Sequence, residues 1–469
     1  MPMHIVDFVQ QVDTTRYFSI LAIVLLINVL FFRKLAFNRY DPLWIVVLSL
    51  SFQLTTPIYL WLVDQDIELK YLVYIICAVL LFWVGAFIAQ QFLRMPRSSL
   101  TDGAHSSQRY PLTAQKGKER FIYIFLTWST LMLMLALLVR AFTSGLPIFA
   151  NNPELEKLLV NRGGLGVLER IIEPSVNCSL IFIYYLARMK GRFTLKLLIY
   201  MVIPLLALLV SGSKSALLTV YYTFYFANTY AALRERQRFA FVSMKVVISG
   251  AVAVLAYATF VLIARANGSG IVDVNKFVAQ TLLTRFIGFS DGIYYFFEGT
   301  TLYSRLHYGI GDYFYLYWIV PLLAPLRLVP YPAQALGNEI IATKLGGIWL
   351  GGPNPTMSVE GFIFFGFGGL LYCFFLGVLF SFCRRIMLKI KMRGNLQALL
   401  LFSIGNLLSL KIASDMILFT ASLFDYFFIA ISTFILGCLV YSVQKYLPHT
   451  FVDTTLEAYT KPTNPAHQS

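Results

Sequence analysis

The stretch YLVYIICAVLLFWVGAFIAQQFL, residues 71–93, runs for 23 residues without a charged side chain. At 1.5 Å per residue, a helix of this length covers about 34 Å, enough to cross a bilayer core of about 30 Å. Residues 18–32, 43–62 and 121–142 are also apolar and long enough, or nearly so. The pattern predicts helices that span a membrane.

The composition of the whole chain agrees with these stretches. Of 469 residues, 58% are hydrophobic and 13% are charged, and the mean hydropathy is +0.70. A soluble domain of this length needs far more polar surface, and the strands of an outer-membrane barrel alternate in pieces of about ten residues. We therefore expect an all-α polytopic membrane protein, with one integral membrane domain over residues 1–469.

The net charge of +15 lies mostly in alternate loops. Basic residues follow the first, third, fifth, seventh and ninth predicted spans, which assigns those loops to the cytoplasm. Counting spans on this basis predicts about 11–12 transmembrane helices, with the N-terminus outside and a disordered cytoplasmic tail at 454–469. Because the charges lie in short loops, no soluble basic domain is left to bind nucleic acid. The proline-interrupted run 313–328 fits a re-entrant segment, an interfacial segment or a further span.

The same topology places residues 264–358 outside the cytoplasm as one large loop. This loop carries basic residues on the side where Lys and Arg are normally depleted, a pattern typical of a site that holds an anion. Its aromatic run, residues 294–297, lies among basic and acidic side chains. Aromatic faces stack on sugars and charged groups bind hydroxyls, so the composition favours a sugar site over an interfacial aromatic belt. The basic residues are Arg265, Lys276, Arg285, Arg305, Arg327 and Lys344.

Other outward segments carry polar groups at membrane depth. Lys214 lies in a Ser/Gly turn that opens a helix, which suits either a phosphate site or a simple helical hairpin. Arg162, in a glycine-rich segment, either pairs with a phosphate or is a solvated turn residue. Glu360 at a membrane entrance is costly unless it is paired or functional, whereas the glycine-rich run 365–369 favours close helix packing. Two further acids flank an outward turn and are equally ambiguous, Asp415 and Asp425.

Four features of the chain together resemble the Wzy-type O-antigen polymerases, which polymerise oligosaccharide repeat units and belong to a wider group that includes the O-antigen ligases. The features are Gly145-Leu146-Pro147-Ile148-Phe149 with Asn161-Arg162-Gly163, then Ser211-Gly212-Ser213-Lys214-Ser215-Ala216, then the large late external loop, and finally Pro325-Leu326-Arg327 through Pro353 to Glu360-Gly361 and Phe365-Gly366-Phe367-Gly368-Gly369. Together they extend over most of the chain.

The resemblance implies a C-type glycosyltransferase-like membrane fold with a large periplasmic loop. The enzyme would act at the outer face of the bacterial inner membrane, in the synthesis of O-antigen or a related surface polysaccharide. It would transfer the growing chain from undecaprenyl pyrophosphate onto a new lipid-linked repeat unit. The implied partners are undecaprenyl-pyrophosphate-linked oligosaccharides, membrane lipid and a chain-length-regulating co-polymerase.

The residues of the chain suit that reaction. A glycosyl pyrophosphate has a good leaving group, so catalysis mainly requires fixed cations at the departing phosphate, and Arg and Lys supply these without a metal or other cofactor. The acceptor hydroxyl needs a base, and one carboxylate contributes about 10²–10⁴-fold. The expected pyrophosphate-binding residues are Lys214, Arg265 and Arg285, supported by Arg162 and Arg305. The expected catalytic residues are Asp291, then Glu298 and Glu360, with His307 as an outside candidate.

Two other functions stay open at this point. Asp64 and Asp66, in an early external loop, suit Mn²⁺ or Mg²⁺ in a metal-dependent polyprenyl-phosphate-sugar glycosyltransferase, although topology alone also gives acidic outer turns. A lipid-linked glycan flippase also binds pyrophosphate-linked sugars through basic residues, but its loops are usually short. The long external loop favours the polymerase.

Overall fold

The computed structural model describes residues 12–63, 67–93, 116–143, 166–210, 216–235, 288–297, 308–330, 336–345, 355–389 and 395–446, with single positions at 252, 256, 259, 263, 306 and 332. Within these residues all regular structure is helical and no strand occurs, so the prediction of an all-α protein is confirmed. The chain divides into two compact units, Met1–Asp425 and Tyr426–Ser469. The expected single membrane domain over 1–469 and the boundaries of the outer loop remain predictions.

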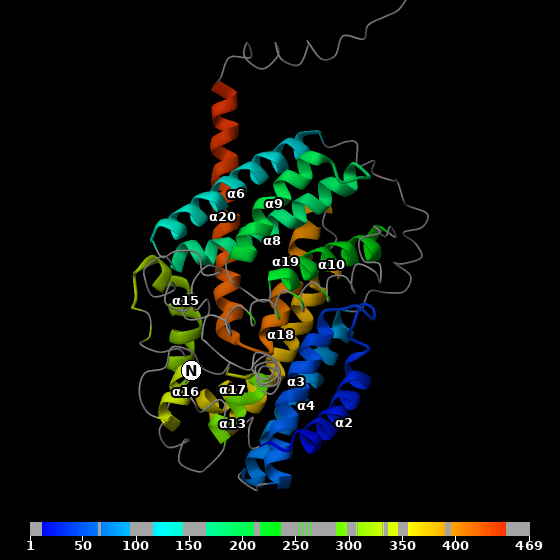
Figure 1. The fold of residues 1–469 in the computed structure, drawn as a ribbon, viewed down its shortest axis with the longest axis vertical. Coiled ribbons are helices and arrows are strands. Elements are labelled where there is room, and N and C mark those ends of the chain that lie inside the picture. The colour runs from blue at the N-terminus through cyan, green and yellow to red at the C-terminus, as the bar shows by residue number, and fades with distance from the viewer. Residues whose placement is uncertain are drawn as a thin grey trace, which may run out of the picture. The chain divides into compact units, whose positions relative to one another are not determined.

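Five described helical segments are long and apolar enough to cross a membrane (Figure 1). They are α2 (Thr14–Phe32), α3 (Leu43–Val63), α4 (Leu69–Phe92), the part Phe121–Phe142 of α6 (Lys116–Thr143), and the run Met357–Lys389. The predicted spans at 18–32, 43–62, 71–93 and 121–142 are therefore confirmed, and the chain is a multi-pass membrane protein. Four shorter apolar helical stretches are Leu195–Leu208, Ile310–Leu326, Leu396–Ile412 and Met416–Ser432. The total of about 11–12 spans stays a prediction.

The other described helices complete the fold. They are α8 (Gly166–Met189), α9 (Leu195–Val210), α10 (Ala216–Glu235), α13 (Asp291–Phe297), α14 (Ile310–Phe314), α15 (Val320–Leu323), α16 (Leu336–Leu345), α19 (Asn395–Ile412) and α20 (Met416–Tyr446). The run Ile310–Leu326, left open by its sequence, is helical throughout. Its prolines fit because they lie in the first turns of α15 and of the following 3₁₀ turn Ala324–Leu326. Arg327, with φ 59°, ends it in a left-handed conformation.

Helices α2, α3 and α4 lie side by side, and α18 (Gly369–Lys389) packs along α4 (Figure 1). Two glycines make the α4–α18 contact close. A Cβ atom added to Gly377 would overlap the carbonyl oxygen of Phe82, and one added to Gly85 would overlap that of Phe374. Backbone therefore meets backbone at this crossing, which only glycine permits.

A second group of helices consists of α6, α8, α9 and α10, which pack against one another. Its core is aliphatic, centred on Leu133, Val176 and Leu180. Buried polar contacts join α6 to α8 at Ser129, whose hydroxyl lies 2.8 Å from that of Ser179 and donates to the Ser175 carbonyl at 3.4 Å. Both α8 and α10 also contact α19, so α8 reaches the region where α19 and α20 meet.

The long apolar run Met357–Lys389 is broken in the middle. It consists of α17 (Met357–Phe365), a 3₁₀ turn at Gly366–Gly368 and α18, with Gly366 at φ 56°. A Cβ added to Gly369 would overlap the carbonyl of Gly361, so the two residues are in contact. In a straight helix, two residues eight positions apart would be separated by about 12 Å. The chain therefore turns sharply and α17 folds back against α18. Close packing, which the glycine-rich run was expected to serve, is present at Gly369, whereas Gly366 has open space around it and the run Met357–Lys389 forms two helices.

Candidate functional site

A cavity of about 410 Å³ lies between α13, the segment before α14, and α17. Its volume is in the range of small-molecule sites, about 300–1,000 Å³. Half of the residues around it are aromatic. The lining residues are Phe296, Leu306, Tyr308, Gly309, Phe362, Ile363, Phe364 and Gly366.

Packing from the first helices fixes α13 at this cavity. Ser290, directly before α13, is buried and its hydroxyl contacts those of Tyr17 and Thr56. Within α13, Phe297 packs against the ring of Tyr71 in α4, at 5.6 Å between centroids. The aromatic run 294–297 was expected to offer rings to a sugar, and within the described structure one of them, Phe296, lines the cavity.

Polar groups stand at the edge of the same cavity. The Tyr308 hydroxyl donates a hydrogen bond to Oε2 of Glu339, in α16, at 2.5 Å. Burial and the neighbouring Glu339 carboxylate raise the pKa of Tyr308, so its hydroxyl stays protonated and acts as a donor. Oδ2 of Asp312 accepts the backbone N–H of Gly309 at 2.8 Å. Rings with nearby carboxylates and a hydroxyl are the groups that recognise a sugar.

Most of the predicted site residues lie outside the described residues. These are Arg162, Lys214, Arg265, Arg285, Glu298, Arg305 and His307. Asp291 begins α13, although its side chain is also outside the description. In the sequence, Arg305 and His307 flank Leu306, and Glu298 follows directly after α13. Their assigned roles therefore remain predictions.

Glu360 is the one predicted site residue whose side chain the structure describes. It lies in the first turn of α17 with an exposed fraction of 1%. Its Oε2 accepts the hydroxyl of Tyr372 at 3.1 Å, and its Oε1 accepts the N–H of Met416 at 3.3 Å. These contacts direct the carboxyl toward α18 and the start of α20, and Glu360 is not among the lining residues of the cavity. Its catalytic role stays a prediction, whereas the expectation that it must be paired agrees with these bonds.

A cluster of ion pairs that the sequence reasoning missed joins α8 to α19 and α20. Arg170 in α8 pairs with Asp425 through Nε and Oδ1 at 2.7 Å, and donates to the carbonyl oxygens of Pro321 and Ala421 at 2.6 and 3.1 Å. Lys411 pairs with Glu173 at 2.8 Å. Charge counting assigned the segments that carry these residues to the outer side. The opposite charges within those segments were the sequence signal that could have indicated the ion pairs.

Asp415, in the turn between α19 and α20, should make the stability of the protein depend on pH. Its Oδ1 caps α20 by accepting the N–H of Leu418 at 3.0 Å. Burial raises the pKa of Asp415 from 3.8 to about 6, despite the opposing effect of backbone N–H groups and Lys411. Because the folded-state pKa is raised, this group's contribution to stability is greatest below pH 4 and is lost as the pH rises through 6.

We therefore expect Asp415→Asn to gain stability over the wild type as the pH rises. Asn also caps helices but does not ionise. Thermal unfolding of the purified protein between pH 4 and 8 measures this, with an expected relative gain of about 2–4 °C above pH 6. A difference in melting temperature that is constant or reversed across this range contradicts the expectation.

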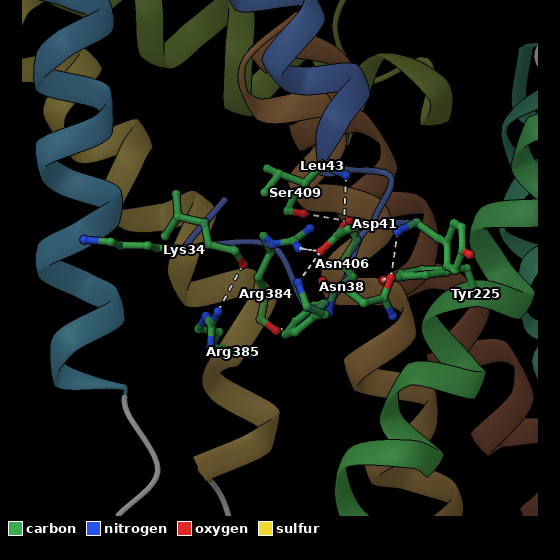
Figure 2. Close-up of polar contacts among 12 residues, drawn as sticks. Lys34, Asn38, Asp41, Leu43, Tyr225, Arg384, Arg385, Asn406 and Ser409 are labelled. Atoms are coloured by element: carbon green, nitrogen blue, oxygen red, sulfur yellow. Dashed lines mark hydrogen bonds and ion pairs between the residues drawn. The ribbon is translucent and has the colours of Figure 1, made fainter. Parts of the chain in front are cut away.

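A different polar cluster holds the loop between α2 and α3 (Figure 2). Asp41 and Arg384 are each 1% exposed and form an ion pair at 2.5 Å. Asp41 also accepts the N–H groups of Phe37 and Leu43, at 2.8 and 2.9 Å. Side chains from three other helices also bind this loop. Gln90 of α4 donates to the Lys34 carbonyl, Arg385 of α18 to the Leu35 carbonyl, and Tyr225 of α10 to the Asn38 side chain. The cluster is a clamp between helices in which the two charges pair with each other through one guanidinium nitrogen of Arg384, while its Nε and Nη1 complete no hydrogen bond among the described residues.

Among the described residues, no three His, Cys, Asp or Glu side chains gather as a metal site, and Asp64 and Asp66 lie outside those residues. Comparisons with protein-family models, curated proteins and solved structures gave no match. The fold and its apolar helices define an all-α, multi-pass membrane protein. Its activity is therefore argued from the sequence motifs together with the cavity.

Proposed function

We propose that the protein is a metal-independent glycosyltransferase that polymerises undecaprenyl-pyrophosphate-linked oligosaccharide repeat units at the outer face of a bacterial inner membrane. The product is O-antigen or a related surface polysaccharide. The observation that carries the proposal is the aromatic cavity with the Tyr308–Glu339 pair at its edge. Three of the predicted site residues neighbour this cavity in sequence, Glu298, Arg305 and His307.

In the proposed reaction, the cavity binds the acceptor sugar. Its C–H faces stack on Phe296 and Phe364 and its hydroxyls bond to the Tyr308–Glu339 pair. An acceptor hydroxyl oxygen attacks the anomeric carbon of the donor chain while the bond from that carbon to the pyrophosphate oxygen breaks. Undecaprenyl pyrophosphate leaves with the electron pair, held by Lys214, Arg265 and Arg285. Asp291, at the start of α13, takes the hydroxyl proton.

The finer parts of the fold and assembly belong to the same proposal. They are the C-type glycosyltransferase-like architecture, the large periplasmic loop at 264–358 and a chain-length-regulating co-polymerase as partner. Aromatic residues within that loop support a role in sugar binding, because Phe296 and Tyr308 line one cavity together with Phe362 and Phe364. The lipid part of the substrate would enter from the membrane that the apolar helices span.

The test is a surface-glycan ladder on a gel, from a deletion strain that expresses wild type, Arg285→Ala or Arg192→Ala at matched protein levels. Arg192→Ala is the control, because Arg192 is exposed in the turn after α8. We expect Arg285→Ala to collapse the ladder to core plus one unit and Arg192→Ala to leave it intact. Loss of the single-unit band as well indicates a flippase. An unchanged ladder contradicts the assignment of Arg285.

Activity that is lost in EDTA and in Asp66→Ala supports the metal-dependent alternative.

Tyr308→Phe tests the cavity itself. The substitution keeps the ring and removes the hydroxyl that donates to Glu339. A hydrogen bond to a charged group contributes about 1.5–3 kcal/mol, so polymerisation in membranes should slow by about 10–100-fold. The rate of chain extension from lipid-linked units measures this. A rate equal to that of wild type removes the cavity from the proposed site.

A further inference from the structure

Glu360 occupies an unusual place in the fold, independently of any glycosyl transfer. It lies in the short helix α17, one turn and a half before the break at Gly366–Gly368 in an otherwise membrane-spanning run. Ionisable side chains within membrane segments are costly and usually mark a site where a proton, an ion or a ligand binds. Broken membrane helices are a common setting for such sites.

No cation reaches Glu360 within the described part of the chain. Its two hydrogen bonds come from the Tyr372 hydroxyl and the Met416 N–H, both longer than 3.0 Å. The groups that interact with it electrostatically are Asp415 and uncharged donors, and none of them is Lys or Arg. A bare carboxylate in such surroundings lacks compensation for the water it has lost.

Tyr317 supplies a second observation. Its side chain is fully buried, and its hydroxyl interacts with the Glu360 carboxyl outside the geometry of a regular hydrogen bond. A carboxylate would accept the proton of this hydroxyl readily. A protonated carboxyl carries its own O–H and can donate to the Tyr317 oxygen, so the contact accommodates either form of Glu360.

Asp415 adds a like charge on the other side. It precedes Met416, whose N–H bonds to Glu360, and the two carboxyl groups interact. Neighbouring carboxyl groups oppose each other's ionisation. Among the described residues, the cation that interacts with Asp415 is Lys411, which is also bound to Glu173 and Ser422. The titratable groups facing Glu360 are Tyr313 and Tyr317 from the α14–α15 run, Tyr372 and Cys373 from α18, and Asp415 from the turn before α20.

We propose that Glu360, together with Tyr317, Tyr372 and Asp415, forms a buried proton-binding site in which the Glu360 carboxyl is protonated at neutral pH. The proton lies on a carboxyl oxygen of Glu360. When it leaves, a negative charge develops between α17 and the start of α20, beside Asp415, and that charge weakens the contact between the two helices. The site therefore links proton release to the position of α17, which also lines the aromatic cavity through Phe362, Ile363 and Phe364.

Infrared spectroscopy of the purified full-length protein in lipid nanodiscs tests the proton directly. The difference spectrum of the wild type minus Glu360→Gln at pH 7 should contain the carbonyl stretch of one protonated carboxylic acid. The control is Glu173→Gln, at a half-exposed carboxylate paired with Lys411, which should leave the band in place. A difference spectrum without this band overturns the proposal.

Thermal unfolding gives a second readout with two variants. Glutamine resembles a protonated carboxyl in shape and hydrogen bonding. The melting temperature of Glu360→Gln should therefore lie within about 2 °C of the wild-type value at pH 7 and above the wild-type value at pH 9. The melting temperature of Glu360→Ala should be lower than that of the wild type at both pH values. If Glu360→Gln loses as much as Glu360→Ala at pH 7, the native carboxyl is ionised and the proposal is wrong. A melting temperature that rises with Na⁺ over choline in the wild type alone, and not in Glu360→Gln, assigns the site to a metal cation and also overturns it.

Discussion

Asp41→Ala should lower the free energy of unfolding by about 3–5 kcal/mol, because it leaves the Arg384 guanidinium buried without its carboxylate. Both side chains are 1% exposed, and Asp41 also accepts two backbone N–H groups of the loop that joins α2 to α3. Among the described residues, the Arg384 guanidinium contacts Asp41 and the rings of Phe37 and Phe380, and none of these contacts is a second carboxylate. Chemical or thermal unfolding of the purified protein measures the loss.

Glu68→Ala is the matched control for this variant. Glu68 also forms a close ion pair, with Lys70 at 2.6 Å, but their side chains are 41% and 53% exposed. Exposed ion pairs contribute little to stability because water screens them, so this variant should unfold almost as the wild type does. The double variant Asp41→Leu/Arg384→Met should recover part of the loss, since it removes both buried charges. If Asp41→Ala costs no more than Glu68→Ala, the buried pair does not hold the loop.

The Asp41–Arg384 pair also shows where sequence reasoning stops. Positive charge after the first and ninth spans was interpreted as an orientation signal, which it is for exposed side chains such as Arg33 and Lys34. Arg384 instead lies buried against Asp41, 343 residues away in the chain. Pairing over such a separation depends on which helices are neighbours, and hydropathy and charge counting carry no information about that.

The spans were predictable because the thickness of a bilayer sets the length of an apolar helix. The same argument could not place the break at Gly366–Gly368. A glycine-rich run is compatible with close packing on a neighbouring helix and also with a sharp turn. The structure has both features, since Gly361 packs against Gly369 and Gly366 has φ 56°. Glycine permits these conformations but does not select between them.

The candidate site was predictable in part. The aromatic run of the outer loop does contribute to a cavity, through Phe296. The sequence could not show that Phe297 would pack against α4, because a ring at a membrane interface and a ring in a core have the same composition. Arg170 and Lys411 were missed for a related reason. Lys411 is the lone basic residue of α19, and Arg170 is one of several basic residues in its segment. The carboxylate partner of each became evident only when α8, α19 and α20 came together.

Gly377→Leu should prevent assembly of the membrane helices. The added Cβ would overlap the carbonyl oxygen of Phe82, and the reciprocal contact between Gly85 and Phe374 leaves α4 and α18 no freedom to shift along each other. Overpacking usually costs about 1–3 kcal/mol, and a clash with backbone on both sides of a crossing belongs at or above the upper end. Fluorescence-detected size exclusion of the detergent-solubilised protein measures the monodisperse fraction, which should fall to a small part of the wild-type value.

Gly311→Leu is the control, since the space around Gly311 in α14 is open and an added Cβ would meet nothing within 4 Å. The same leucine there should leave the monodisperse peak unchanged, because it adds a side chain without displacing backbone. Gly85→Leu should repeat the defect of Gly377→Leu from the other helix. A normal peak for either of these two variants would mean that α4 and α18 can separate without loss of the fold. The clamp at Asp41 and the break beside Glu360 would then not depend on that crossing, although α18 carries both Arg384 and the Tyr372 partner of Glu360.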